Sequence, residues 1–443
     1  MRPKSTVSLK SPMAPSTADV AAVRAAHLMP LPGPMFAKPL QIVAGNMQFL
    51  FDESGKEYLD GFAGVATVSI GHSHPHFVAR LKAQIDMLQH NPPLYLHSAV
   101  GAFAKRLADK AKSVNPDMDV CFFTNSGSEA NEMAAFVAKT YTARHDFIAI
   151  QRSYHGRTLL TTALTGQHTW RNQQPYPVGV SFSPTDYAYR FDGTPEQSTR
   201  MALKGLAATL NSSTQGKLAG FFAETIMGVG GLITPGRSYF AEAADIVHKH
   251  GGLFICDEVQ AGVGRTGEHY FGIKHWNAKP DIIVMAKGLG NGYPIGAVIT
   301  TRAIADAMKG VLHYNTFGGG PMAIAAADAV MDIVEKEDLA GNSKRVGDRL
   351  LAGLRKLQQK DERVGDVRGM GLMIGVELVK DKKSKEIAPE LTVRIVESMK
   401  DQGVLVGKGG LEGNTLRIQP PMCWTMRDAD RAVAALEQAL KDA

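Results

Sequence analysis

Cysteine is scarce in this sequence. The chain of 443 residues contains three, Cys121, Cys256 and Cys423, and no two of them have the close spacing of a metal-binding pair. We therefore expect neither a disulfide framework nor a metal site, and the protein fits a reducing compartment. Cys121 and Cys256 lie inside apolar runs, so each is interpreted as a small buried hydrophobic side chain.

Long apolar runs and basic runs are also missing. No stretch approaches the roughly 18 uninterrupted apolar residues that a membrane-spanning helix requires, so we expect a soluble protein with no membrane partner. Lysine and arginine number 49 against 43 acidic residues, a net charge of +6, and they are spread along the chain. Nucleic acid is therefore not an expected partner. The absence of internal repeats excludes solenoid folds.

The chain does have the length and composition of a globular enzyme with more than one domain. Hydrophobic residues make up 44% and charged residues 21% of the 443, and this length exceeds what one core usually serves. We predict an N-terminal arm over 1–35, the first part of a small domain over 36–95, a large domain over 96–335 and the rest of the small domain over 336–443. The basic start, rich in Ser and Pro, fits either a mobile arm of a cytoplasmic protein or a mitochondrial transit segment.

Between about residues 100 and 330, apolar runs alternate with helical patterns. The run 120–124 is followed by a glycine-containing turn at 125–128 and by an alanine-rich helical pattern over 129–140. Further buried-strand candidates lie at 218–223, 252–256, 282–286 and 295–300. This pattern predicts an α/β fold in which helices cover both faces of a mostly parallel sheet.

The flanking regions predict a smaller α+β domain. Two short strand-like runs, 48–52 and 56–60, are separated by a turn-forming Glu-Ser-Gly tripeptide, which is typical of a hairpin. A long charged helical pattern runs from 339 to about 361, and strand and helix candidates follow at 371–378 and 393–399. The pattern of the large domain therefore ends near residue 335.

Two opposite charges end two of the apolar runs. Asp257 follows 253–256, and Lys287 follows 282–286. The carboxyl ends of parallel strands face one crevice, so both side chains are expected at the same site. A lysine in an apolar setting loses its proton more readily and can form a Schiff base with an aldehyde, whereas an aspartate keeps a pyridine nitrogen protonated. The pair predicts pyridoxal 5'-phosphate (PLP) chemistry. The alternatives are a structural ion pair, or two residues that each merely cap a strand at the surface.

Two further motifs fit the same cofactor. Ser126, Gly127 and Ser128 lie where a strand turns into a helix, and such a turn offers backbone N–H groups to a phosphate. Tyr154 follows the apolar run 147–150, so its ring is expected at a strand end, where a flat cofactor can stack. Either motif alone equally suits an ordinary helix-capping turn or a half-buried loop tyrosine.

The ordered motifs resemble those of the class III aminotransferases, the ω-aminotransferase group of fold-type I PLP enzymes. The likeness extends from about residue 35 to the carboxyl end, and within the group it is greatest to the alanine-glyoxylate aminotransferase 2 type. The stretches that carry it are 125–131, 154–156, 257–267 and 286–294, together with the spacing from Asp257 to Lys287. The resemblance implies the fold type I architecture and a PLP-dependent aminotransferase.

The resemblance also implies roles for individual residues. Lys287 forms the Schiff base and then serves as the proton shuttle, and Asp257 pairs with the pyridine nitrogen. Tyr154 covers one ring face, and Gln260 lies near the ring hydroxyl. The rest of the implied cofactor-binding set holds the phosphate or lies beside it and the ring: Gly127 and Ser128 for the phosphate, with Ser126, His155, Glu224 and Val259 nearby.

Two residues outside these motifs complete the implied site. Thr316 matches the threonine that reaches the phosphate of the other subunit, which implies a homodimer with shared active sites and leaves a tetramer open. Arg417 matches the arginine that binds an α-carboxylate through a two-pronged hydrogen-bonded pair. Val229 stands where the γ-aminobutyrate type has the glutamate that pairs with this arginine, so we do not expect simple gating by a glutamate.

These patterns predict transamination in two half-reactions. A small-molecule amino donor, an ω-amino acid or alanine, gives its nitrogen to PLP, and an oxo acid such as pyruvate or glyoxylate takes it up. Two alternatives stay open here. Decarboxylation-dependent transamination or amino-mutase chemistry would use the same fold and cofactor. A binding or regulatory module of the same fold would not require Lys287, whose presence argues against it.

Overall fold

The structure of the chain is a computed structural model that describes residues 15–30, 33, 35–171 and 176–443. The predicted N-terminal arm lies partly outside the described residues. Its described part contains helix α1 (Thr17–His27), which has no buried residue. Within the described ranges, none of the helices combines the length and the apolar character that a bilayer crossing requires.

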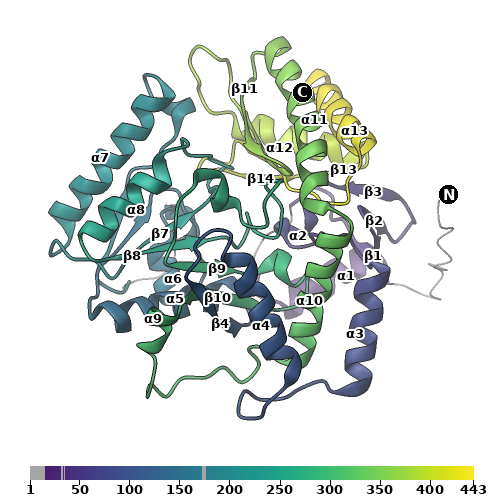
Figure 1. The fold of residues 1–443 in the computed structure, drawn as a ribbon. Helices are drawn as coiled ribbons and strands as arrows, with labels where there is room; N and C mark the ends of the chain where they lie inside the picture. Colours follow the sequence, from purple (N-terminus) through teal and green to yellow (C-terminus); the bar gives the residue numbers. More distant parts are fainter. Residues whose placement is uncertain (1–14, 31–32, 34, 172–175) are drawn as a thin grey trace.

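A seven-stranded sheet forms the centre of the molecule (Figure 1). The four pairings that join β9, β8, β7, β5 and β6 are parallel, which confirms the mostly parallel sheet. Strand β10 is the antiparallel exception in this sheet, because it runs opposite to both of its neighbours, β4 and β9. In spatial order the strands are β4 (Met118–Thr124), β10 (Gly296–Thr301), β9 (Ile282–Met285), β8 (Leu253–Asp257), β7 (Gly220–Glu224), β5 (Phe147–Ile150) and β6 (Val180–Ser183).

Helices cover both faces of this sheet because its strand residues alternate between two apolar layers. Phe147 and Ala149 of β5 pack in one layer, and Ile148 and Ile150 pack in the other. The first layer is covered by α5 (Gly127–Thr142), α6 (Leu159–Leu164) and α9 (Arg302–Asp306). The second is covered by α4 (Ser98–Ala111), α7 (Pro195–Ser213), α8 (Tyr239–Lys249) and α10 (Pro321–Lys336). Helix α5 begins at Gly127, so the turn predicted at 125–128 is shorter than expected.

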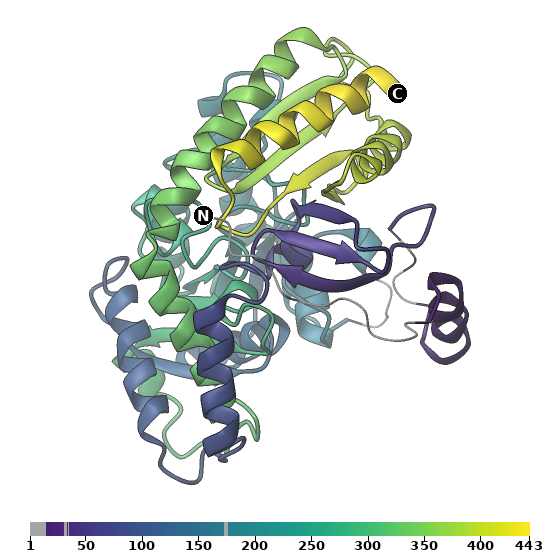
Figure 2. The ribbon, with the colours of Figure 1, turned by 90° about the vertical axis from the view of Figure 1, so that its right-hand side faces the viewer.

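A second sheet brings together three strands from the N-terminal part of the chain and one strand from the C-terminal part. The predicted hairpin is present as β2 (Phe49–Asp52) and β3 (Glu57–Asp60), and Gly55 takes the left-handed conformation in its turn, with φ +84°. Strand β1 (Ile42–Asn46) pairs with β2, and β13 (Val404–Leu405) pairs in parallel with β3. In Figure 2 the purple hairpin lies against the yellow-green C-terminal layer.

The third sheet is antiparallel, and three helices accompany it. Its order is β11 (Val364–Met370), β12 (Met373–Leu378), β15 (Thr415–Ile418) and β14 (Gly407–Gly409). The helices are α11 (Leu339–Lys360), α12 (Pro389–Asp401) and α13 (Met426–Asp442). The predicted long helix and the strand after it are thus present, and the predicted helix candidate at 393–399 is the central part of α12.

The connection between α10 and α11 lies near the predicted boundary at residue 335. Asp338 separates the two helices in a left-handed conformation, with φ 49°. Helix α3 (Pro75–Met87) packs along α10, as Figure 2 also shows. The division of the chain at 35, 95 and 335 stays a prediction. Short helical turns complete the described elements: α2 (Ala63–Ala66), η1 (His168–Trp170), η2 (Ala188–Arg190), η3 (Gly272–Trp276) and η4 (Lys287–Leu289).

Candidate active site

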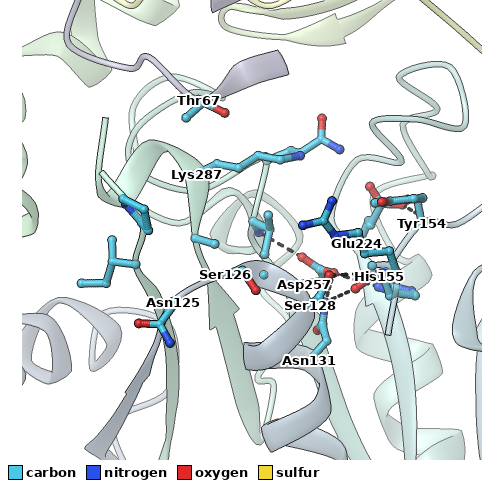
Figure 3. A pocket seen from close by; sticks show the side chains of 18 of the residues that line it. Thr67, Asn125, Ser126, Ser128, Asn131, Tyr154, His155, Glu224, Asp257 and Lys287 are labelled. Atoms are coloured by element: carbon cyan, nitrogen blue, oxygen red, sulfur yellow. Dashed lines mark hydrogen bonds and ion pairs between the residues drawn. The ribbon is translucent and has the colours of Figure 1, made fainter. Parts of the chain in front are cut away.

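A cavity of about 350 Å³ lies at the carboxyl ends of the parallel strands of the central sheet (Figure 3). Ligands are expected at this edge because strand ends and the amino ends of the following helices converge there. All of the predicted site residues except Thr316 and Arg417 line it. They are Ser126, Gly127, Ser128, Tyr154, His155, Glu224, Asp257, Val259, Gln260 and Lys287.

Asp257 ends β8 and is buried in a fixed orientation. Its Oδ2 accepts a hydrogen bond from Asn131 Nδ2 at 2.8 Å and lies 2.8 Å from His155 Nδ1. Its Oδ1 accepts from the backbone N–H of Val259 at 3.0 Å. Asn131 also donates to the carbonyl oxygen of His155 at 2.8 Å, so the three side chains form one cluster (Figure 3). The carboxylate is therefore held rigidly at the cavity wall.

Lys287 follows β9 and projects into the same cavity between Thr67 and Asp257 in the view of Figure 3. Its backbone is left-handed, with φ 44°, a conformation that is costly for a residue with a Cβ and that is found preferentially at functional sites. Burial, together with the positive charge of Arg417, lowers the pKa of its amine to about 8. A substantial fraction of the amine is thus neutral near physiological pH and able to attack an aldehyde.

The amino end of α5 forms a second wall of the cavity. Ser126 caps the helix by accepting a hydrogen bond from Glu129 N at 3.2 Å. A Cβ on Gly127 would lie 3.2 Å from both terminal methyl groups of Val259. Glycine at this position therefore avoids a close contact with Val259 and leaves its own backbone accessible from the cavity. Ser128 Oγ accepts from the backbone N–H of Arg157 at 3.2 Å. Free N–H groups at a helix start suit an anion such as phosphate.

Glu224 joins two loops beneath the cavity. Its Oε1 accepts from the backbone N–H of Tyr154 at 2.8 Å, and its Oε2 accepts from Gly228 N at 2.9 Å. Complete burial raises the pKa of this carboxyl to about 7. The ring of Tyr154 packs edge-on against Trp170, with 5.1 Å between ring centroids. Glu224 therefore fixes the loop that presents the tyrosine ring to the cavity.

Arg417 lies on β15 and reaches the site through Gln260. Its Nη2 donates to Gln260 Oε1 at 2.9 Å and to Gln419 Oε1 at 2.8 Å. The side chain is buried, which lowers the pKa of the guanidinium to about 10, so the group stays positively charged at neutral pH. The guanidinium also lies over the ring of Phe62, 5.2 Å from its centroid.

Thr316 lies away from this cavity. It is exposed and borders a different depression of about 720 Å³, next to residues 313–317 and the start of α5. Thr316 therefore does not contribute to the cavity of its own protomer. Its predicted contact with the cofactor of another subunit stays a prediction.

Sequence reasoning missed several residues of the site. Asn131 lies one helical turn beyond Gly127 and Ser128, so its spacing on α5 was a usable signal. Gln419 is two residues beyond Arg417, which places both on the same side of an extended strand. Thr67 and Arg157 line the cavity from loops, where no periodic pattern marks them.

Comparisons with known proteins agree with this geometry. The model of the family described as Aminotransferase class-III matches residues 36–440. Alanine–glyoxylate aminotransferase 2 homolog 2, mitochondrial, of Arabidopsis thaliana is 44% identical over 427 residues, which cover 96% of this chain and 88% of that protein. Alanine–glyoxylate aminotransferase 2, mitochondrial, of Homo sapiens is 39% identical over 439 residues, which cover 94% and 84%.

A solved structure has the same overall architecture. It is an amine transaminase from an uncultivated Pseudomonas species in the PLP-bound (internal aldimine) form, and it superposes with a TM-score of 0.88. The two proteins are 32% identical, and the superposition covers 94% of this chain and 98% of the other.

Proposed function

Because this chain belongs to the class III aminotransferases, a family of PLP-dependent enzymes, we propose that it moves an amino group from an ω-amino acid or alanine to an oxo acid such as pyruvate or glyoxylate. The reaction class follows from the family. The donor, the acceptor and the roles of individual residues are the proposal.

One observation carries it. A half-buried lysine and a buried aspartate line one cavity, and they come from the carboxyl ends of two adjacent parallel strands. If the two residues formed a structural ion pair, the carboxylate and the amine would be in direct contact. Within the described residues, however, no carboxylate lies within 4.0 Å of Lys287 Nζ. The amine is thus available for covalent chemistry, which favours a catalytic role over a structural one.

The cavity fits PLP in its chemistry. The amino end of α5 with Gly127 offers N–H groups to the phosphate, Tyr154 offers a ring face, and Asp257 offers a fixed anion. Asp257 suits a protonated pyridine nitrogen, and Gln260 suits a ring hydroxyl. When bound, PLP supplies an aldehyde carbon that reacts with amines and a protonated ring that withdraws electrons from the bonds at the donor Cα.

Lys287 acts first as nucleophile and then as acid and base. Its Nζ holds the cofactor in the resting enzyme, and once free it takes the proton from the donor Cα. In the second half-reaction the same Nζ returns a proton to the carbon of the former oxo group. A pKa of about 8 supports this use, since proton transfer in either direction then costs little near neutral pH.

Asp257 holds the proton on the pyridine nitrogen, and its neighbours hold Asp257. Asn131, His155 and the Val259 N–H together fix both carboxylate oxygens. His155 is itself buried, and its Nε2 has no hydrogen-bond partner among the described residues. The histidine therefore serves as an orienting group rather than as an exchanging base.

Thr316 and a second copy of the chain complete the site. The segments 94–96 and 311–317 expose large apolar side chains, Leu96 with 104% and Leu312 with 95% relative exposure. The ring of Phe317 lies 5.5 Å from the ring of His90, so the second segment contacts the stretch of chain that leads to 94–96. Covering this apolar area supports a homodimer in which Thr316 reaches the partner's phosphate. A tetramer would be formed from such dimers.

Plain transamination is favoured over the alternative chemistries. The family model and the two relatives above are named for aminotransferases, and no described residue specifically favours decarboxylation-dependent transamination or a mutase. The cellular compartment stays a prediction of cytoplasm or mitochondrion. Both relatives are named as mitochondrial, and residues 1–14 lie outside the described part of the chain.

A screen of purified protein with PLP tests the proposal. Alanine is paired with glyoxylate, whereas β-alanine, 3-aminoisobutyrate and γ-aminobutyrate are each paired with pyruvate and with glyoxylate, and both products are measured. Amino transfer from at least one donor is expected, and Lys287→Ala should abolish it while leaving the fold intact. Wild-type protein that binds PLP but transfers no amino group in any pairing would contradict the proposal. Released carbon dioxide would instead support the decarboxylating alternative.

A further inference from the structure

The guanidinium of Arg417 has amide partners in place of a carboxylate. Its Nη2 and Nε donate to Gln419 Oε1 at 2.8 and 3.2 Å, and Nη2 also donates to Gln260 Oε1 at 2.9 Å. Gln419 Nε2 in turn donates to Gln260 Oε1 at 3.3 Å, which links the two amides. Among the residues that the structure describes, no carboxylate oxygen lies within 4.0 Å of this guanidinium, although the side chain is only 4% exposed.

We propose that Gln419, together with Gln260, is a positioning residue that holds Arg417 in a neutral cradle, so that its full positive charge is available to the carboxylate of a short amino or oxo acid. The inference rests on the proposed function and specifies how that site recognises its substrates. An amide oxygen satisfies N–H donors without cancelling their charge, whereas a carboxylate in the same place would do both.

Two glycines leave space for the contact between Arg417 and Gln260. A Cβ on Gly409 would lie 2.5 Å from Arg417 Cδ, and a Cβ on Gly228 would lie 2.3 Å from Gln260 Cδ. Glycine at both positions therefore gives the two side chains the space in which they meet. The ring of Phe62 lies against the guanidinium from another direction, and its face attracts the cation without neutralising it.

Glu224, a buried acid that acts electrostatically on Arg417, is already hydrogen-bonded to other groups. Glu224 is close enough to influence the charge of Arg417, but its two oxygens accept the N–H groups of Tyr154 and Gly228. Val229, the next residue after Gly228, offers no carboxylate either. A substrate carboxylate thus meets a guanidinium whose charge is not cancelled, and it does not compete with an internal anion.

The test is a charge change with the same shape, Gln419→Glu. A carboxylate here pairs with Arg417, so the KM of the oxo-acid acceptor should rise about tenfold or more while kcat at saturating acceptor stays within about twofold. The dissociation constant of propanoate, an unreactive monocarboxylate, should rise by a similar factor in calorimetry on the PLP-loaded enzyme. Gln402→Glu is the matched control, because Gln402 is exposed on the small domain and should leave both constants unchanged.

A double-mutant cycle separates positioning from general damage. In an Arg417→Ala background, the neutral change Gln419→Leu should have almost no further effect on propanoate binding, since Gln419 acts only through Arg417 and leucine adds no charge that would itself repel propanoate. With Arg417 present, Gln419→Leu should weaken propanoate binding about threefold or more, because the guanidinium is no longer held in the orientation that receives the carboxylate. This neutral variant also serves if the glutamate impairs folding.

Unchanged propanoate binding in both Gln419 variants would overturn the inference, and so would equal losses in the presence and absence of Arg417. Failure of the proposed function has a different signature. In that case wild-type protein transfers no amino group in the donor and acceptor screen, whatever the Gln419 variants do to propanoate binding.

Discussion

Lys287 combines a left-handed backbone with a desolvated amine whose pKa is lowered to about 8. A lowered pKa means that the amine is mostly protonated below pH 8 and mostly neutral above it. Only the neutral amine attacks the PLP aldehyde, so attachment of PLP to apoenzyme should accelerate about tenfold per pH unit below pH 8 and level off above it. Stopped-flow absorbance from about pH 6 to pH 9 measures this rate. A profile without a break near pH 8 would contradict the burial argument.

Asp257 provides the second prediction at this scale. Asp257→Asn keeps the hydrogen-bonding shape of the side chain but removes the negative charge that holds a proton on the pyridine nitrogen. The variant should retain PLP and lose about a thousandfold or more in kcat, measured with the best donor of the screen. A loss within about tenfold, roughly 1.4 kcal/mol of barrier, would mean that another group protonates the ring.

Single residues differ in how far the sequence could predict them. Asp257 and Lys287 each end an apolar run, and a buried strand followed by a charge is a local signal. The partners of Arg417 carry no such signal, because Gln260 and Gln419 are 159 residues apart and meet only in the folded chain. Thr316 was assigned through the family resemblance, and a single protomer cannot test a contact with another subunit.

At the scale of helices and strands, the amino end of α5 links stability to cofactor binding. Ser126 caps this helix, and its neighbours present N–H groups to the cavity. Ser126→Ala should lower the free energy of unfolding by about 1 kcal/mol and also weaken PLP binding. Denaturant unfolding of apoenzyme and a PLP titration measure the two effects.

A second capped helix supplies the control for this experiment. Thr425, which does not line the cavity, caps α13 by accepting a hydrogen bond from Asp428 N at 3.3 Å. Thr425→Ala should cost a similar amount of stability and leave the PLP dissociation constant unchanged. Equal losses of PLP affinity in the two variants would show that the Ser126 effect is only a general loss of stability.

The positions of these elements were largely predictable, and their directions were not. Strand bounds from the apolar runs agree with the structure to within about two residues, since a fully buried strand reads as a continuous apolar segment. The antiparallel direction of β10 could not be predicted from the sequence, because a short buried strand has the same apolar pattern whether its neighbours are parallel or antiparallel. The hairpin of β2 and β3 was predictable from its glycine turn, but its pairing with β13 was not.

At the scale of the whole molecule, the proposed homodimer predicts that assembly and activity fail together. Leu96→Asp places a charge at the most exposed part of the apolar surface, so it should shift the protein toward monomer in sedimentation and reduce turnover, because Thr316 no longer reaches a second site. Val393→Asp on α12 is the control, because Val393 is 48% exposed and belongs to neither apolar segment. A fully active monomer would contradict shared active sites.

The pairing of β13 with β3 also constrains the order of events on the ribosome. Beside this junction Lys56 Nζ donates to the carbonyl oxygen of Asp401, and the two residues are 345 positions apart. At typical synthesis rates the later strand emerges on the order of tens of seconds after the earlier one. Throughout that interval the edge of β3 has no partner from the C-terminal half, so the nascent chain presents an open strand edge that is a target for chaperones or for aggregation. Chains truncated before residue 404 should keep the edge of β3 unpaired permanently.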